Sequence, residues 1–261
     1  MSLSVTTLSS SSSGNSVLVT GNGRSILIDC GIPVKRLKDG LESAGVKLSD
    51  VEGILLTHEH DDHIRTVAVV SENYGIPVYA ERRTLAAVKA RTDLKGGFYF
   101  ESMRPFMLAG MEIRPFPTPH DAVSPVGYSV ATADKRYVQA TDIGWFSPEV
   151  ERAMRGADVA LIESNHDVDM LLNGKYPLYL KERILSRHGH LSNGNCAEAV
   201  LKILDSGTRN IILGHLSEHN NTAELAFNTT NEAIERRGAV LGKDYVLVVA
   251  NARKPGRGVA V

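Results

Sequence analysis

The sequence has little cysteine, almost no net charge and no long apolar run. Cys30 and Cys196 are its two cysteines, too few and too scattered for a disulfide framework, and neither belongs to a CxxC zinc pattern. We therefore expect a reducing, cytoplasmic location. No stretch approaches the roughly 18 apolar residues of a membrane span, and the N-terminus lacks the basic and apolar segments of an export signal. We expect a protein that is neither exported nor embedded in a membrane.

Two further absences restrict the chemistry. The 29 basic and 30 acidic residues nearly cancel, so no global field draws the molecule toward nucleic acid or a membrane surface, and any anionic partner must be held locally. There is no GxSxG elbow and no P-loop. The sequence therefore gives no support to a nucleophilic serine or to a nucleotide cofactor.

Strand-like and helix-like patterns interleave along the whole chain, and 43% of the residues are hydrophobic, enough for a sizeable core. Short β-type runs separated by turn residues open the chain and predict an antiparallel start. No repeat, long linker or charge block marks a boundary. We predict a single domain over 1–261, with 254–261 as a candidate flexible tail. The expected strands are 4–8, 16–20, 25–29, 51–56, 77–80, 111–116, 126–130, 136–139, 159–162, 210–213 and 245–250, and the expected helices are 34–44, 84–90, 148–155, 179–186, 196–204 and 222–234.

The densest group of metal-binding residue types follows the apolar run 51–56, in the sequence THEHDDH at 57–63. Zinc, manganese and iron accept such a mixture of imidazole and carboxylate, whereas calcium and magnesium prefer oxygen ligands. In a loop before a helix, His58 and His60 can converge on one ion while Asp62 and His63 face a neighbouring one. A solvated polar loop is the alternative reading, and the ligand spacing disfavours it.

One cluster cannot complete two coordination spheres, so further ligands are expected at other strand ends. His120, Asp142 and His215 each follow directly after an apolar run. Strand ends are where such a fold gathers its site. Each residue alone would be an ordinary cap or turn residue, so the prediction depends on all three together.

The motifs HxHxDH at 58–63, TDxG at 141–144 and GHLS at 214–217, with LIDCG at 27–31, resemble the metallo-β-lactamase superfamily. The resemblance covers nearly the whole chain and implies an α/β fold, the four-layer αββα sandwich. It assigns His58, His60 and His120 to one metal ion, and Asp62, His63 and His215 to the other. Asp142 would bridge the two ions, and Asp29 would support the ligand histidines from behind.

Further segments resemble one branch, the YycJ/WalJ/VicX family of small bacterial proteins. They are SSSSGNS at 10–16, PHDAVSPVGY at 119–128, ESNHD at 163–167, MLLNGKYP at 170–177, LKERI at 180–184, GHLSN at 189–193 and LGHLSEHNN at 213–221. The resemblance implies a 5′ to 3′ exonuclease acting on DNA, with kinship to tRNase Z and RNase J. Glu163 and His190 then resemble the Glu and His of two tRNase Z motifs that assist proton delivery to the leaving group. The 72 residues between Asp142 and His215 leave no room for the large insertion of RNase J, and no Gly/Pro-rich arm of the tRNase Z type is present.

The implied mechanism is hydrolysis of a phosphodiester by a hydroxide that bridges two divalent ions, zinc or manganese, with iron as a third candidate. Asp62 would accept the proton of the attacking water, and His190 with Glu163 would protonate the departing sugar oxygen. We expect DNA as the substrate. Weaker predictions of substrate contacts fall on Ser12, Asn15, His166, Lys181, Asn220 and Asn221. A surface role is the alternative for His166 and Lys181, and a capping role is the alternative for Asn220 and Asn221.

Other functions remain open because fold and metal ligands do not fix the substrate. A thioesterase or lactonase would use the same fold, and an RNA-directed nuclease would use the same chemistry. A di-iron redox module is disfavoured because such proteins replace the second histidine of the motif by glutamate, and here His60 is present. A purely structural metal site is disfavoured because ligands from several loops, with positions left for water, are the form that catalytic metals take.

Overall fold

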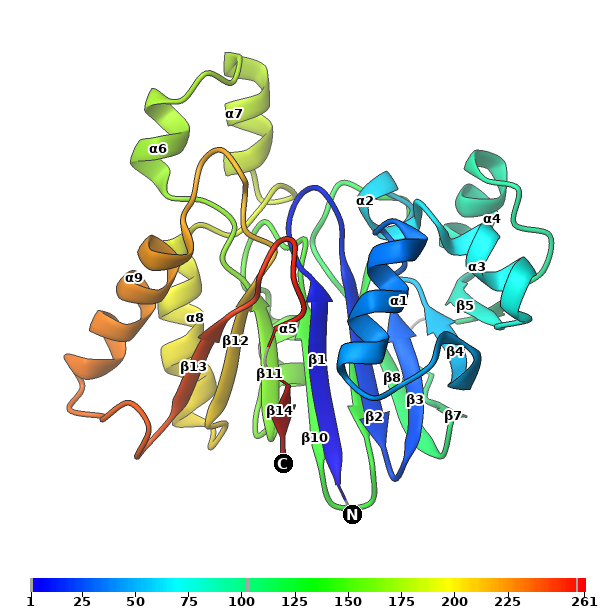
Figure 1. The fold of residues 1–261 in the computed structure, drawn as a ribbon. Coiled ribbons are helices and arrows are strands. Elements are labelled where there is room, and N and C mark those ends of the chain that lie inside the picture. Colours follow the sequence, from blue (N-terminus) through cyan, green and yellow to red (C-terminus); the bar gives the residue numbers. More distant parts are fainter. Residues whose placement is uncertain (1, 102–103, 257) are drawn as a thin grey trace.

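The computed structural model describes residues 2–101, 104–256 and 258–261. Two mixed β-sheets lie face to face, and helices cover both outer faces (Figure 1). This arrangement confirms the predicted αββα sandwich. Within the described ranges, no helix has the length and apolar character needed to cross a membrane.

The first sheet has seven strands in the order β14-β1-β2-β3-β4-β5-β6. Strands β1, β2 and β3 pair antiparallel, as predicted, and β3 to β6 run parallel. Helices α1, α3 and α4 lie on the outer side of this sheet (Figure 1). The elements of this half are β1 (Leu3–Ser9), β2 (Ser16–Gly21), β3 (Arg24–Ile28), α1 (Val34–Ser43), η1 (Leu48–Asp50), β4 (Val51–Leu55), α2 (Asp61–Ile64), α3 (Val67–Tyr74), β5 (Val78–Glu81), α4 (Arg82–Arg91), β6 (Phe98–Phe100) and β14 (Val259–Ala260).

The second sheet has seven strands in the order β13-β12-β11-β10-β9-β8-β7. Strands β7 to β10 pair antiparallel and β10 to β13 run parallel. Helices α5, α8 and α9 pack on its outer side, while α6 and α7 project beyond one end of the sandwich (Figure 1). The elements of this half are β7 (Phe106–Leu108), β8 (Met111–Pro117), β9 (Val126–Ala131), β10 (Arg136–Ala140), α5 (Pro148–Met154), β11 (Val159–Glu163), α6 (Val168–Asn173), α7 (Leu178–Leu185), α8 (Asn193–Asp205), β12 (Asn210–Gly214), α9 (Ala223–Glu235) and β13 (Val246–Val249).

Strand β3 shows how alternation in the sequence produces the layers. Ile26 and Ile28 point into the core between the two sheets, whereas Leu27 points to the helices outside. All three side chains are fully buried. Because successive strand side chains point to opposite faces, a strand that is apolar on both faces must be covered on both.

The C-terminal segment differs from the expected free tail at 254–261. Ala260 and Val259 pair with Ser4 and Val5 of β1, and Val261 exchanges two backbone hydrogen bonds with Leu3. The physical reason is that β1 offers an open edge and Val259 adds apolar surface to the core between the sheets. The one-domain interpretation of 1–261 stays a prediction.

Candidate metal centre

The predicted ligands meet at one edge of the sandwich because each follows the end of a strand. His58 and His60 come after β4, His120 after β8, Asp142 after β10, and His215 after β12. Strands β8, β10 and β12 lie in the second sheet and β4 lies in the first, and the ends of these strands meet at one edge of the sandwich, where residues distant in sequence become neighbours. The sequence order of strands and polar residues thus produces one cluster.

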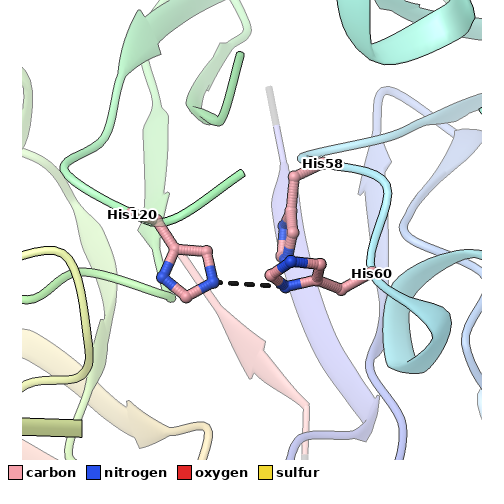
Figure 2. Close-up of side chains that lie close together, drawn as sticks. All are labelled: His58, His60 and His120. Carbon is pink, nitrogen blue, oxygen red and sulfur yellow. Dashed lines mark hydrogen bonds between the residues drawn. The ribbon is translucent and has the colours of Figure 1, made fainter. Parts of the chain in front are cut away.

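The first ligand group is formed by His58, His60 and His120. One ring nitrogen from each lies within 4.8 Å of the others. Figure 2 shows the rings turned toward one another, and His60 Nδ1 lies 3.3 Å from His120 Nε2. Three imidazole nitrogens at this separation can share one cation.

The second group is formed by Asp62, His63 and His215. Asp62 Oδ2 lies 3.4 Å from His63 Nε2 and 3.6 Å from His215 Nε2. Asp142 lies between the two groups, since its Oδ2 is 3.3 Å from His63 Nε2 and its Oδ1 is 3.7 Å from His120 Nε2. Asp142 therefore lies within reach of both groups.

Several inward-facing atoms of this cluster have no hydrogen-bond partner in the described part of the chain. They include His58 Nε2, His215 Nε2 and Asp142 Oδ2, all of them buried. Buried polar atoms without a partner are costly, and a divalent cation is a partner that imidazole nitrogens and carboxylate oxygens can share. The residues present thus fit divalent metal ions.

The charges in the cluster suit metal ligands. Burial opposes ionisation of Asp142, but the neighbouring His215 and His63 outweigh it and hold the pKa of this carboxyl well below its usual range. Burial also opposes protonation of His215, yet the nearby carboxylates of Asp142 and Asp62 and the hydrogen bond to Glu163 raise its pKa to about 10. For His58, burial and the nearby His63 hold the pKa well below normal. The carboxylates are therefore ionised, while some imidazoles carry a proton that a cation must displace.

Asp29 lies behind the cluster and holds the residues that follow β4 in place. Its Oδ2 accepts a hydrogen bond of 2.8 Å from His63 Nδ1, and its Oδ1 accepts one of 2.8 Å from the Thr57 backbone N–H. A carboxylate that fixes Nδ1 leaves Nε2 free for a metal ion. The predicted position of Asp29 behind a ligand histidine agrees with this geometry.

Glu163 lies behind a second pair of histidines. Its Oε1 is 2.8 Å from His190 Nδ1 and 2.6 Å from His215 Nδ1, while its Oε2 accepts from the backbone N–H groups of Ile143 and Leu191. Burial opposes ionisation, but His190 and His215 lower the pKa of Glu163 to about 2. An ionised Glu163 can only accept, so Nδ1 of His190 carries the proton. Glu163 thus holds His190 and His215 by their Nδ1 atoms, and one of its oxygens lies within 4.8 Å of ligand atoms of Asp142, His190 and His215.

The backbone at the strand ends is strained at three of these residues. Asp29, Asp142 and His215 have φ values of 62°, 56° and 54°, in the left-handed region that non-glycine residues rarely adopt. Such conformations persist where surrounding structure enforces them and gather at functional sites. Here the positive φ values occur directly after strands, at residues whose side chains belong to the cluster or support it.

The residues predicted to contact substrate have varied surroundings. Ser12 is exposed on the loop between β1 and β2. Asn15, on the same loop, is buried, and its Nδ2 donates to Asp62 Oδ2 over 3.2 Å and to the Ser11 carbonyl over 2.9 Å. Asn15 therefore orients a metal-ligand candidate, a role that its Ser/Gly-rich flanks did not indicate.

Asn220 and Asn221 form hydrogen bonds with the loops around β11 and β12. The Asn221 amide bonds to the Ser164 and Asn165 carbonyls and to the Asn193 side chain, which leaves it no free donor. Asn220 is buried, and its carbonyl accepts from the Asp167 backbone N–H. These contacts join loops, and the substrate contacts expected of Asn220 and Asn221 stay predictions.

His166 and Lys181 complete the predicted set. His166 is 1% exposed, both of its ring nitrogens lack a partner among the described residues, and burial lowers its pKa to about 4. Lys181 Nζ donates to the Leu172 carbonyl over 2.6 Å, which ties α7 to α6. Lys181 therefore links two helices through a hydrogen bond, whereas burial keeps the His166 imidazole neutral in the loop after β11.

Two contacts near the cluster were not predicted from the sequence. Glu59, inside the histidine motif, accepts from the Val123 backbone N–H over 2.9 Å and so links the loop after β4 to that after β8. Arg183 donates to both oxygens of Asp121, the residue after His120. The partners lie 64 and 62 residues apart, so no local pattern pairs them.

Comparison with known proteins places the chain in a family. A profile described as "Beta-lactamase superfamily domain" matches residues 24–216. The exodeoxyribonuclease WalJ of Streptococcus pneumoniae serotype 2 (strain D39 / NCTC 7466) is 37% identical over 243 residues, which cover 91% of this chain and 90% of that protein. The exodeoxyribonuclease YycJ of Bacillus anthracis is 34% identical over 260 residues, 98% of each chain. The chain belongs to the YycJ/WalJ family of the metallo-β-lactamase superfamily.

Solved structures agree on the fold of this YycJ/WalJ family member. The metallo-β-lactamase fold protein YhfI from Bacillus subtilis superposes with a TM-score of 0.76, at 16% identity and with 100% of both chains covered. The short form of human tRNase Z gives a TM-score of 0.64 at 15% identity, covering 97% of this chain and 98% of that one. At such identities the likeness concerns the fold alone. It agrees with the predicted αββα fold.

Proposed function

We propose that this protein is a metal-dependent hydrolase of phosphodiesters, an exonuclease that degrades DNA from the 5′ end. One observation carries the proposal. A buried cluster of His and Asp with unpaired inward-facing atoms lies in a chain 34–37% identical, over nearly its whole length, to proteins named exodeoxyribonucleases. The coincidence of a suitable site with full-length relatives favours a nuclease over a thioesterase or lactonase.

The ligands proposed for two divalent ions are those of the two groups and the residue between them. His58, His60 and His120 would hold one ion, Asp62, His63 and His215 the other, and Asp142 would bridge them. When bound, such ions lower the pKa of a water molecule and neutralise phosphate charge. Zinc and manganese are the proposed metals because the donors are mostly imidazole, and iron stays a third candidate. A cytoplasmic location stays part of the proposal.

Two side chains are proposed to move protons. Asp62, beside His63 and His215, would accept the proton of the attacking water. His190 has Nδ1 fixed by Glu163 and a side chain that is 15% exposed, so the doubly protonated ring would give its Nε2 proton to the departing sugar oxygen and keep its Nδ1 proton on the hydrogen bond to Glu163. Glu163 is then a positioning residue, which fixes the tautomer and orientation of His190 as the acidic member of a catalytic triad does for its histidine.

End-labelled substrates test the function directly. The purified protein, supplied with manganese or zinc, is incubated with single-stranded DNA, duplex DNA, RNA and a panel of thioesters and lactones. We expect mononucleotides to be released stepwise from the 5′ end of DNA. The His60→Ala protein, incubated in parallel, should lose metal and activity together.

Three results would contradict parts of the proposal. Hydrolysis of a thioester or lactone without cleavage of nucleic acid would replace the nuclease by a small-molecule hydrolase. Faster cleavage of RNA than of DNA would change the substrate, and an active, metal-free His60→Ala protein would exclude the metal mechanism.

A further inference from the structure

The carboxylate of Asp121 lies beside the first ligand group without belonging to it. Asp121 follows His120 directly, and its Oδ1 lies 3.4 Å from His120 Nε2, the nitrogen that also lies 3.3 Å from His60 Nδ1. Donor atoms that share one ion are separated by about this distance when each metal–ligand bond is about 2.0–2.1 Å long. The group whose atoms all lie within 4.8 Å of one another comprises His58, His60 and His120 and does not include Asp121. Asp121 is therefore a carboxylate at the margin of the metal site.

Arg183, in the last turn of α7, holds this carboxylate. Its Nε donates to Asp121 Oδ2, and its Nη2 donates to Oδ1 over 3.0 Å. A guanidinium that binds both oxygens fixes the plane of a carboxylate, whereas a single contact leaves the carboxylate free to turn. The Arg183 and Asp121 side chains are 47% and 33% exposed, and an ion pair in contact with solvent adds little to the stability of a fold. Fold stability is therefore a weak explanation of this pair.

The loop that carries His120 is also joined to the chain after α7 by hydrogen bonds that do not involve the Arg183 side chain. The Asp121 backbone N–H donates to the His188 carbonyl over 3.1 Å, and His120 Nδ1 donates to the Gly189 carbonyl over 3.2 Å. The second contact leaves Nε2 of His120 unprotonated for a metal ion. A Cβ built on Gly189 would lie 2.2 Å from the Arg183 carbonyl oxygen, so the chain turns back tightly against the end of α7. Without the Arg183 side chain these bonds remain, and His120 is still held.

A hydrolytic metal site needs a coordination position that the protein does not fill. Catalytic zinc keeps such a position for water, whereas a further protein ligand closes the site into a structural one. A carboxylate is a good ligand for zinc and manganese. Next to His120, an unpaired Asp121 would be a further ligand of this kind. The two contacts with Arg183 occupy the oxygens that an ion would otherwise bind.

We propose that Arg183 is a positioning residue, which keeps the Asp121 carboxylate out of the coordination sphere of the first ion and so leaves a position open for water. The inference rests on the proposed metal-dependent function and adds to it a residue that acts through Asp121. It predicts an unusual sign. Loss of the Arg183 side chain tightens metal binding and slows hydrolysis, whereas loss of a side chain that merely supports the site weakens metal binding.

Water bound to manganese gives the most direct readout. Full-length protein is loaded with Mn²⁺, and the relaxation rate of the water protons is measured, which rises with the number of exchangeable water molecules on the metal. We expect Arg183→Ala to lower this rate and, in competition with a chromophoric chelator, to hold one ion about tenfold more tightly. Its kcat on DNA should fall by about tenfold, because Asp121 takes the position of the water.

Three further variants assign the effect to Asp121. When Asp121→Asn is added to Arg183→Ala, the relaxation rate and kcat should return toward the wild-type values, because a neutral amide is a poorer ligand than a carboxylate. Arg183→Lys keeps the charge but not the two-point contact, so it should lie between the wild type and Arg183→Ala. Arg155→Ala is the matched control: it removes an exposed arginine that pairs with Glu151 at the end of α5, and it should leave all three measurements unchanged.

Distinct results separate this inference from the proposed function. Weaker or unchanged metal binding by Arg183→Ala would overturn the inference, as would a double variant that behaves as Arg183→Ala does. Tighter binding with an unchanged relaxation rate would also overturn it, because the loss of a positive charge alone, an effect that added salt weakens, would then be sufficient. A wild-type protein that never cuts DNA, with the expected changes in metal binding and relaxation in Arg183→Ala, would instead contradict the proposed function and leave the role of Arg183 at the metal site.

Discussion

At the scale of single residues, the metal centre depends on side chains that hold the ligands as much as on the ligands. Asp29 fixes His63, Glu163 fixes His190 and His215, and Asn15 fixes Asp62. The ligand candidates could be proposed because they stand in motifs or directly after strands, and Asp29 and Glu163 were proposed from motifs as well. The role of Asn15 as a holder could not be predicted, because Asn15 and Asp62 lie 47 residues apart and only the fold brings them together.

Asn15→Ala should weaken metal binding by about 10- to 100-fold, because Asp62 loses the hydrogen bond that orients it. Competition with a chromophoric chelator measures the affinity. Ser12→Ala, an exposed change in the same loop, should leave metal affinity as it is. Equal affinities for wild type and Asn15→Ala would show that Asp62 is oriented without the asparagine.

His190→Ala should lower kcat on DNA by about 10²- to 10⁴-fold with the metal content intact, because the departing sugar oxygen loses its proton donor. Hydrolysis of bis(p-nitrophenyl) phosphate should fall far less, since p-nitrophenolate leaves without a proton. Equal losses on the two substrates would assign His190 to the metal ligands instead, a reading that its closeness to Asp142 and His215 keeps testable.

At the scale of elements, the loops after β3 and β4 approach each other closely enough to require a glycine. A Cβ built on Gly31 would lie 1.6 Å from the Asp62 carbonyl oxygen. The neighbouring Cys30 backbone N–H donates to the His63 carbonyl over 2.8 Å. The position of α2, and with it Asp62 and His63, therefore depends on Gly31 having no side chain.

Gly31→Ala should destabilise the protein by about 3 kcal/mol or more and reduce metal binding, because α2 must move. Thermal unfolding with and without metal measures both effects. Gly194→Ala, in α8 where an added Cβ meets nothing within 4 Å, should be neutral or slightly stabilising. A Gly31→Ala protein with wild-type stability and metal affinity would exclude this close approach.

Most elements could be predicted from hydrophobic period and turn residues, and those missed lacked a clear local signal. The run at 51–56 corresponds to β4, and 196–204 lies within α8. Helix α3 was missed because its sequence VAVVSENY is rich in β-branched residues, although Val67 and Val70 face the core at helical spacing. Strand β14 was missed because two residues gain strand structure only by pairing with β1. Short elements depend on partners that a local pattern does not contain.

At the scale of the whole molecule, two nearly balanced sets of charges are distributed unevenly. The carboxylates of Asp62 and Asp142 lie among histidines in the candidate metal centre, whereas the whole chain has a net charge of −1. A nearly neutral molecule can therefore collect cations at one edge and, through them, attract an anionic substrate there.

Metal binding should release protons, because the carboxylates around His215 raise its pKa to about 10 and its imidazole is protonated at neutral pH before a cation arrives. Metal affinity should accordingly rise as the pH increases toward that pKa. Isothermal titration in buffers of different ionisation enthalpy measures the protons released. A binding enthalpy independent of the buffer would contradict the assignment of His215 as a ligand.

The count of metal ions per chain tests the central claim most directly. Elemental analysis of the protein after loading with zinc or manganese and exhaustive dialysis should give two ions per chain in the wild type and fewer in Asp142→Ala, whose bridging carboxylate is lost. A wild-type protein that retains no ion while it hydrolyses DNA at full rate would contradict the paired-metal account.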